Sequence, residues 1–209
     1  TDDGFEVNAS IPSYSQWYEE ADLEFAYRQH KHLIQIIGSR DLEKRWLFKY
    51  PVHLRHLPSL FKVYPDACVV WTHRDPAQVL PSYCSLMAGF RAIFEDDTNP
   101  RDMSDRQLEL WARGADRALA FRQQCAPGQF YDLQFEDFMA DPMTAIASIY
   151  RYFDQPLSDE AQSRMRTWSG KNRQHKHGKH SYSADIGVSV EAIHERFGNY
   201  MRALNVRAE

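Results

Sequence analysis

The segment T-H-R-D-P-A-Q-V-L-P-S (72–82) contains the residues best suited to bind an anion. It follows an apolar run that predicts a strand, and Asp75 with Pro76 is typical of a helix start, where a free amide needs an acceptor and proline lacks an amide. Arg74 therefore lies between a strand end and a helix N-terminus, where unpaired N–H groups favour an anion. Its planar guanidinium group matches phosphate oxygens, and the hydroxyl of Ser82, two turns further along the same helix face, could add a donor.

A second interpretation of this segment stays open. Arg74 would then form an ion pair with a neighbouring acid, and Ser82 would be an ordinary residue of the helix surface. The pattern by itself favours neither interpretation, although helix starts that bind anions are common.

The predicted elements alternate between strands and helices. Apolar runs predict strands at 45–51, 67–73 and 130–138. Apolar residues at helical spacing predict helices at 14–37, 52–63, 76–94, 105–124, 141–154, 158–168 and 189–204. This order favours one α/β domain over 1–209, with a parallel sheet and flanking helices. Ligands of such sheets bind outside the carboxyl ends of the strands, which is where Arg74 lies.

Lys49 and His53 lie around the end of the first predicted strand and are also candidates. A histidine can remove a proton near neutral pH, but His53 could equally be a helix N-cap or the buried partner of a backbone carbonyl. Together with His56 and His73 it invites a zinc interpretation. No carboxylate or cysteine is well placed beside these histidines, so we expect no metal.

Charge and composition exclude several classes of protein. The formal net charge of -4 argues against a protein that coats nucleic acid by neutralising phosphates. The segment K-N-R-Q-H-K-H-G-K-H (171–180) is nevertheless basic throughout, which indicates either a single anionic ligand or a solvated surface loop.

The chain also lacks the signs of a membrane or secreted protein. No stretch approaches ~20 consecutive apolar residues, and the first residues do not resemble a signal peptide. Cys68, Cys84 and Cys125 are far apart and form neither a metal-binding nor a disulfide pattern, which favours the cytoplasm.

Two blocks, W-L-F-K-Y-P-V-H-L (46–54) and F-K-V-Y-P-D-A-C-V-V-W-T-H-R-D-P-A-Q-V-L-P-S (61–82), carry a family resemblance. They resemble the central block of the sulfotransferases that use 3'-phosphoadenylyl sulfate (PAPS), in particular their bacterial branch. The pattern Y-x-x-W-x-x-x-A-D (14–22), the segment F-E-D-F-M-A-D-P (135–142) and G-K-H-S-Y (178–182) extend the likeness along the chain. No single motif is unique, but their order and spacing are fairly specific.

The resemblance implies a fold similar to P-loop nucleotide kinases and a PAPS cofactor. In that family an arginine at the strand end and a serine eight residues later bind the 3'-phosphate, and here these positions are Arg74 and Ser82. A basic C-terminal loop closes over the phosphate, and its equivalents are Arg173, Lys176, Gly178 and Lys179. The reaction would move a sulfuryl group to a hydroxyl or amine of a small acceptor that the sequence does not identify.

For the catalytic residues, the resemblance to the family is weaker. In the cytosolic branch a lysine and a histidine at the strand end stabilise charge and remove the acceptor's proton, which implies these roles for Lys49 and His53. There they stand two residues apart, whereas here they stand four apart with Pro51 between them. In other branches the base is a glutamate beside a glycine-rich phosphate loop.

Two departures from the family remain. No glycine-rich loop for the 5'-phosphosulfate occurs here, so we expect an N-terminal part outside this chain. Phe135 replaces a tyrosine that contacts the adenine; its ring could stack on a base but has no hydroxyl to donate. The alternatives are a phosphotransferase on the same fold and a nucleotide-binding protein without catalytic activity.

Overall fold

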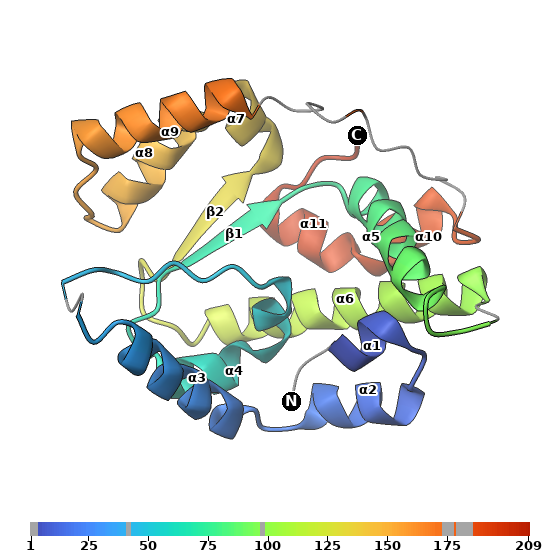
Figure 1. Ribbon diagram of the computed structural model, residues 1–209. Helices are drawn as coiled ribbons and strands as arrows, with labels where there is room; N and C mark the ends of the chain where they lie inside the picture. The colour runs from blue at the N-terminus through green and yellow to red at the C-terminus, as the bar shows by residue number, and fades with distance from the viewer. Residues whose placement is uncertain (1–3, 41–42, 97–98, 173–177, 179–185) are drawn as a thin grey trace.

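A two-stranded parallel sheet lies at the centre of the computed structural model, which describes residues 4–40, 43–96, 99–172, 178 and 186–209 (Figure 1). Strand β1 (Val69–His73) pairs with β2 (Phe130–Gln134), and His73 lies opposite Gln134 at the carboxyl ends. The connection between them contains helices α5 (Pro76–Arg91) and α6 (Pro100–Arg122), as expected for parallel strands. The α/β class predicted from the sequence is therefore confirmed.

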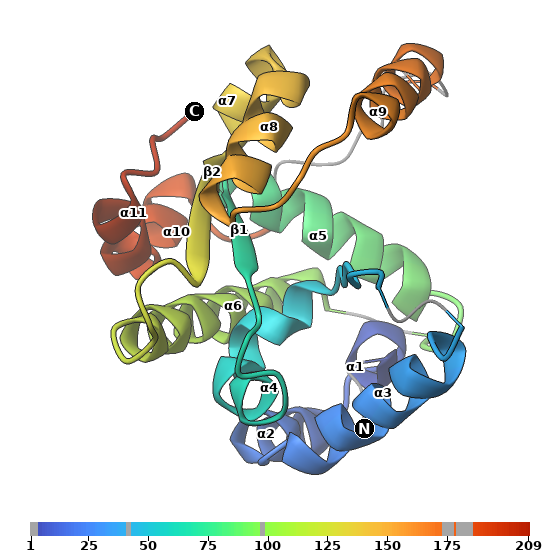
Figure 2. The ribbon, with the colours of Figure 1, turned by 90° about the vertical axis from the view of Figure 1, so that its left-hand side faces the viewer.

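Further helices surround this unit. In Figure 1, α6 runs along one side of the strands and α8 lies on the other. The remaining elements are α1 (Gly4–Asn8), α2 (Pro12–Glu20), α3 (Glu24–Ile37), a 3-10 helix η1 (Pro51–His56), α4 (Leu57–Val63), α7 (Phe135–Ala140), α8 (Pro142–Tyr152), α9 (Asp159–Lys171), α10 (Val190–Arg196) and α11 (Gly198–Leu204). Figure 2 shows α9 standing away from the helices that enclose the strands, and none of its side chains is buried.

Two clusters of buried side chains hold the fold together. The larger one joins β1 and β2 to α5, α6, α10 and α11, where Trp71, Leu80, Met87, Phe130 and Ile193 are its bulkier members. The smaller one joins α2 and α3 to η1 and α4 and contains Tyr18, Leu23, Tyr27, Val52 and Val63. The first cluster fixes the strand ends, and the second fixes the segment that carries His53.

The first predicted strand, 45–51, is wrong. Residues 44–50 form no strand, and their side chains are exposed, with Leu47 at 92%. A strand requires backbone hydrogen bonds to a neighbour, and within the described part of the chain the sheet contains only β1 and β2. The apolar run therefore reflects β-propensity, but the described residues supply no strand with which it could pair.

Other boundaries differ for local reasons. The helix predicted at 14–37 is two helices, because Asp22 accepts hydrogen bonds from the Glu24 amide and from Ser59 Oγ, both at 2.9 Å, and ties the break to α4. The helix predicted at 189–204 is likewise divided at Phe197 into α10 and α11. The strand predicted at 130–138 ends at Gln134, after which α7 begins.

No helix of the described residues is long and apolar enough to cross a membrane. The three cysteines are free thiols in the structure.

Candidate functional site

The carboxyl ends of β1 and β2 bring Arg74 and Phe135 together. Because His73 and Gln134 are paired, the residue that follows each strand lies at the same edge of the sheet. The Arg74 guanidinium carbon lies 4.6 Å from the centre of the Phe135 ring, a cation–π geometry. A pocket of about 200 Å³ opens here, lined by His73, Arg74, Asp75, Gln134, Phe135, Glu136, Asp137, Asn205, Val206, Arg207 and Glu209.

A carboxylate occupies the guanidinium fork of Arg74. Arg74 Nε donates to Oε1 of Glu209 and Nη2 donates to Oε2, each at a distance of 3.0 Å. These two parallel hydrogen bonds are the arrangement with which arginine binds two oxygens of a carboxylate or a phosphate. The structure thus shows Arg74 paired with an acid, as in the second interpretation, and phosphate binding by the same fork stays a prediction.

Asp75 anchors the elements around this fork. Its buried carboxylate accepts hydrogen bonds from the Ala77 amide, from Nε2 of His194 and from the Glu209 amide, each at a distance of 2.8 Å. Burial would raise the pKa of Asp75, but the hydrogen bonds from Glu209, Ala77 and His194 together lower it. The predicted N-cap is confirmed, and the same residue also holds α10 and the C-terminal segment against the start of α5.

Replacing Asp75 by alanine should therefore destabilise the protein more than the loss of an ordinary cap. The change removes the cap of α5 and leaves buried donors unpaired, so we expect the free energy of unfolding to fall by roughly 2–3 kcal/mol. Urea unfolding at pH 7 measures the loss, and Asp141→Ala, which removes the solvent-exposed cap of α8, is the matched control. An equal loss in both variants would contradict the anchoring role.

A buried network that the sequence did not predict includes His73, the residue before Arg74. His73 is 1% exposed; its Nε2 lies 2.8 Å from Oδ1 of Asp132, and its Nδ1 lies 3.1 Å from the Tyr200 hydroxyl. Arg122 donates to both oxygens of Asp132, at distances of 2.7 and 2.6 Å. Burial would raise the pKa of Asp132, but the hydrogen bonds from His73 and Arg122 lower it. The network ties both strands to α6 and α11. The feature of the sequence that could have indicated this network is Asp132, an acidic residue within the apolar run of β2.

Other residues predicted for phosphate binding are distributed differently. Ser82 lies half-buried on α5, on the helix that Arg74 precedes, but it does not line the pocket. Gly178 is exposed with a positive φ of 94°, which glycine adopts readily. Arg173, Lys176 and Lys179 lie outside the described residues.

His53 lies in η1, between aromatic residues from two segments. Its Nδ1 is 2.9 Å from the Tyr27 hydroxyl, and its ring meets that of Tyr50 edge to face. Burial is the main cause that lowers the pKa of His53 to about 4, and the nearby His30 is the second. Lys49 lies on the exposed segment that leads into η1. For the zinc interpretation, no group of three or more possible metal ligands occurs among the described residues.

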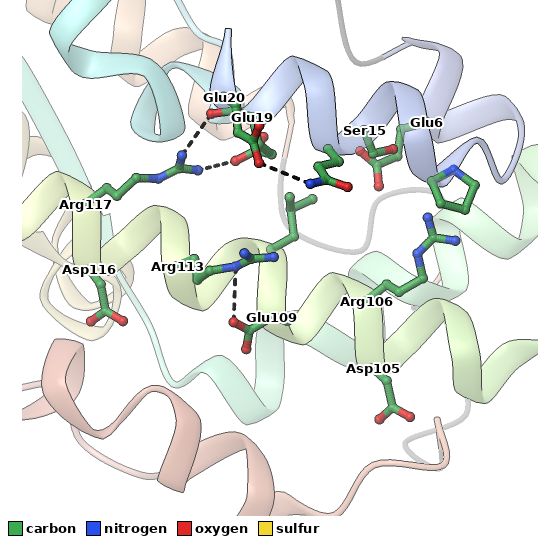
Figure 3. A pocket seen from close by; sticks show the side chains of 13 residues that line it. Glu6, Ser15, Glu19, Glu20, Asp105, Arg106, Glu109, Arg113, Asp116 and Arg117 are labelled. Carbon is green, nitrogen blue, oxygen red and sulfur yellow. Dashed lines mark hydrogen bonds and ion pairs between the residues drawn. The ribbon is translucent and has the colours of Figure 1, made fainter.

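A larger pocket, of about 610 Å³, lies between α1, α2 and α6 (Figure 3). Its walls carry both signs of charge, and many of the charges are paired with each other, as Arg113 is with Glu109 and Arg117 with Glu19. None of the residues predicted for the site lines it. A self-neutralised surface of this kind has little attraction for a single anion, so the strand-end pocket is the better candidate.

Comparisons with known proteins identify the family of this chain. Residues 2–159 match the sulfotransferase family. The crystal structure of sulfotransferase STF1 from Mycobacterium tuberculosis is 38% identical and superposes with a TM-score of 0.83, over 93% of this chain and 50% of that one. Sulfotransferase STF9 from Mycobacterium avium is 28% identical with a TM-score of 0.88, over 98% of this chain and 53% of that one.

A curated relative is also similar. The omega-hydroxy-beta-dihydromenaquinone-9 sulfotransferase Stf3 of Mycobacterium bovis is 26% identical over 110 residues, which is 52% of this chain and 28% of that protein. The chain thus spans about half the length of the solved sulfotransferases it matches.

Proposed function

The chain belongs to the sulfotransferase family, and from this premise we propose that the whole protein transfers a sulfuryl group from PAPS to a hydroxyl or amine of a small acceptor. The observation that carries the proposal is the fork of Arg74, which holds two anionic oxygens at the carboxyl end of β1 beside the ring of Phe135. A nucleotide offers both a phosphate for such a fork and a base for such a ring.

Arg74 and Ser82 are the residues we propose for the 3'-phosphate of PAPS, with Arg173, Lys176, Gly178 and Lys179 closing over it. In this proposal the phosphate replaces the carboxylate of Glu209 in the fork. The N-terminal amides of α5 add partial positive charge near the same point, since Arg74 directly precedes its Asp75 cap. Ser82 would then reach a second side of the phosphate from further along α5.

His53 and Lys49 are the residues we propose for the acceptor end of the reaction. Sulfuryl transfer needs an in-line arrangement of acceptor and donor, neutralisation of the charge that develops, and removal of the acceptor's proton. Lys49 is exposed and can supply positive charge, whereas His53 can either take a proton or donate a hydrogen bond. The relative Stf3 is named as a sulfotransferase of an omega-hydroxy compound, which favours a hydroxyl acceptor here.

A transfer assay tests the proposal. The complete protein is incubated with PAPS labelled in the sulfuryl group and a panel of alcohols and amines, and labelled product is separated from the donor. ATP labelled in the γ-phosphate serves as the parallel donor. Transfer from PAPS supports the proposal, transfer from ATP alone would make the protein a phosphotransferase, and tight PAPS binding without any transfer across a broad panel would favour a nucleotide-binding protein.

A further inference from the structure

Two tyrosine–histidine pairs join α3 to the segments that follow it. The Tyr27 hydroxyl lies 2.9 Å from Nδ1 of His53, and Nδ1 of His30 lies 2.7 Å from the Tyr64 hydroxyl. Both pairs therefore connect α3 to the η1–α4 region, but only the first involves a residue of the proposed acceptor site. The chain thus contains a candidate pair and a matched reference pair.

The direction of the first hydrogen bond follows from the surroundings of Tyr27. Tyr27 is 8% exposed, and His53 Nδ1 is the only hydrogen-bond partner that the described residues give its hydroxyl. A buried hydroxyl proton needs an acceptor. If Tyr27 donates to Nδ1, this proton is satisfied; if the ring donates instead, the hydroxyl proton has no acceptor among the described groups.

In a neutral imidazole one ring nitrogen carries the proton and the other accepts. If Nδ1 accepts from Tyr27, the proton must therefore be on Nε2. We propose that Tyr27 is a positioning residue that fixes His53 in the Nε2–H form, so that His53 donates a hydrogen bond to the group in transfer and does not act as its base. This inference rests on the proposed function for its catalytic meaning. The acceptor's proton would then pass to a group other than His53.

Two further observations support the neutral form. Burial and the proximity of His30 lower the pKa of His53 to about 4, so the ring is uncharged at pH 7. Burial also raises the pKa of Tyr27, which therefore keeps its proton. General bases work best with a pKa near the working pH, so a pKa this low suits a donor better than a base.

Nitrogen NMR of the ring tests the geometry without reference to activity. In the complete protein labelled at histidine, we expect the His53 signals at pH 7 to show a neutral ring with the proton on Nε2. In Tyr27→Phe we expect a mixture of the two tautomers, while His53 in Tyr64→Phe keeps the wild-type pattern. A proton on Nδ1 in the unaltered chain would overturn the proposal, because Tyr27 would then be the acceptor and Nε2 a possible base.

Kinetics of the complete enzyme test the catalytic meaning. Tyr27→Phe should lower kcat by about three- to ten-fold with little change in KM for PAPS, whereas Tyr64→Phe should change neither by more than about two-fold. Urea unfolding shows whether both variants remain folded. Equal losses in the two variants would assign the Tyr27 bond to the packing of α3 alone. If no variant and no wild-type protein transfers a sulfuryl group, the proposed function fails while the NMR result still decides the tautomer.

Discussion

Arg74→Ala is expected to weaken binding of 3',5'-bisphosphoadenosine, the product of PAPS, by roughly ten- to a hundred-fold. The variant loses two charge-assisted hydrogen bonds, whose geometry is already visible in the bidentate contact with Glu209. It also loses the cation held over the Phe135 ring. Ser82→Ala removes a single neutral donor and should weaken binding more mildly. Isothermal titration calorimetry of the complete enzyme measures both effects.

The control ligand is adenosine 5'-phosphate, which lacks the 3'-phosphate and whose weak binding should hardly change in either variant. If both nucleotides lose affinity equally, Arg74 acts on the fold or on another part of the ligand, and the assignment fails. Arg74→Lys refines the test, because it keeps the charge but not the planar fork, and should recover only part of the affinity.

The Glu209 carboxylate has to be accounted for in the same experiment. In the unaltered protein the phosphate must displace this carboxylate, so the measured affinity is a difference between two anions on one fork. Glu209→Gln should raise nucleotide affinity by about two- to five-fold, the worth of a partly exposed ion pair. Measured in that background, the effect of Arg74→Ala should be larger. If Arg74→Ala leaves nucleotide affinity unchanged in the Glu209→Gln background, the phosphate does not use this fork.

The position of Arg74 was predictable because its causes are local. A β-rich run, an aspartate cap and a proline at the first helical position specify a strand-to-helix turn within a few residues. What fills the fork was not predictable, since Glu209 is separated from Arg74 by 135 positions in the sequence. The same holds for Asp132, whose partners come from β1 and α6.

The failure of the strand at 45–51 has a related cause. Apolar side chains give a segment β-propensity, but only a neighbouring strand supplies the hydrogen bonds, and no pattern within the segment itself reveals that neighbour. Ser82 shows the limit of helical periodicity as well. Its spacing from Asp75 correctly places it on the helix, but whether it faces the pocket depends on how α5 tilts against the strands.

His53→Ala in the complete enzyme is expected to lower turnover by ~10²-fold or more while leaving nucleotide affinity nearly unchanged. The reason is that His53 lies in η1, away from the Arg74 pocket, whose lining it does not share. The matched control is His32→Ala, which removes an exposed histidine from α3. Turnover within a few-fold of wild type in His53→Ala would move the catalytic group to another part of the protein.

His53→Gln separates the two chemical roles that remain for this residue. A glutamine amide can donate a hydrogen bond in the place of Nε2–H, but it cannot accept a proton at neutral pH. If Tyr27 holds His53 in the Nε2–H form, glutamine should recover about ten-fold of the turnover lost in the alanine variant. If His53 is the base, glutamine should be as inactive as alanine. Because both variants lack the imidazole, neither can act as the base, and an advantage of glutamine over alanine therefore supports the hydrogen-bond role.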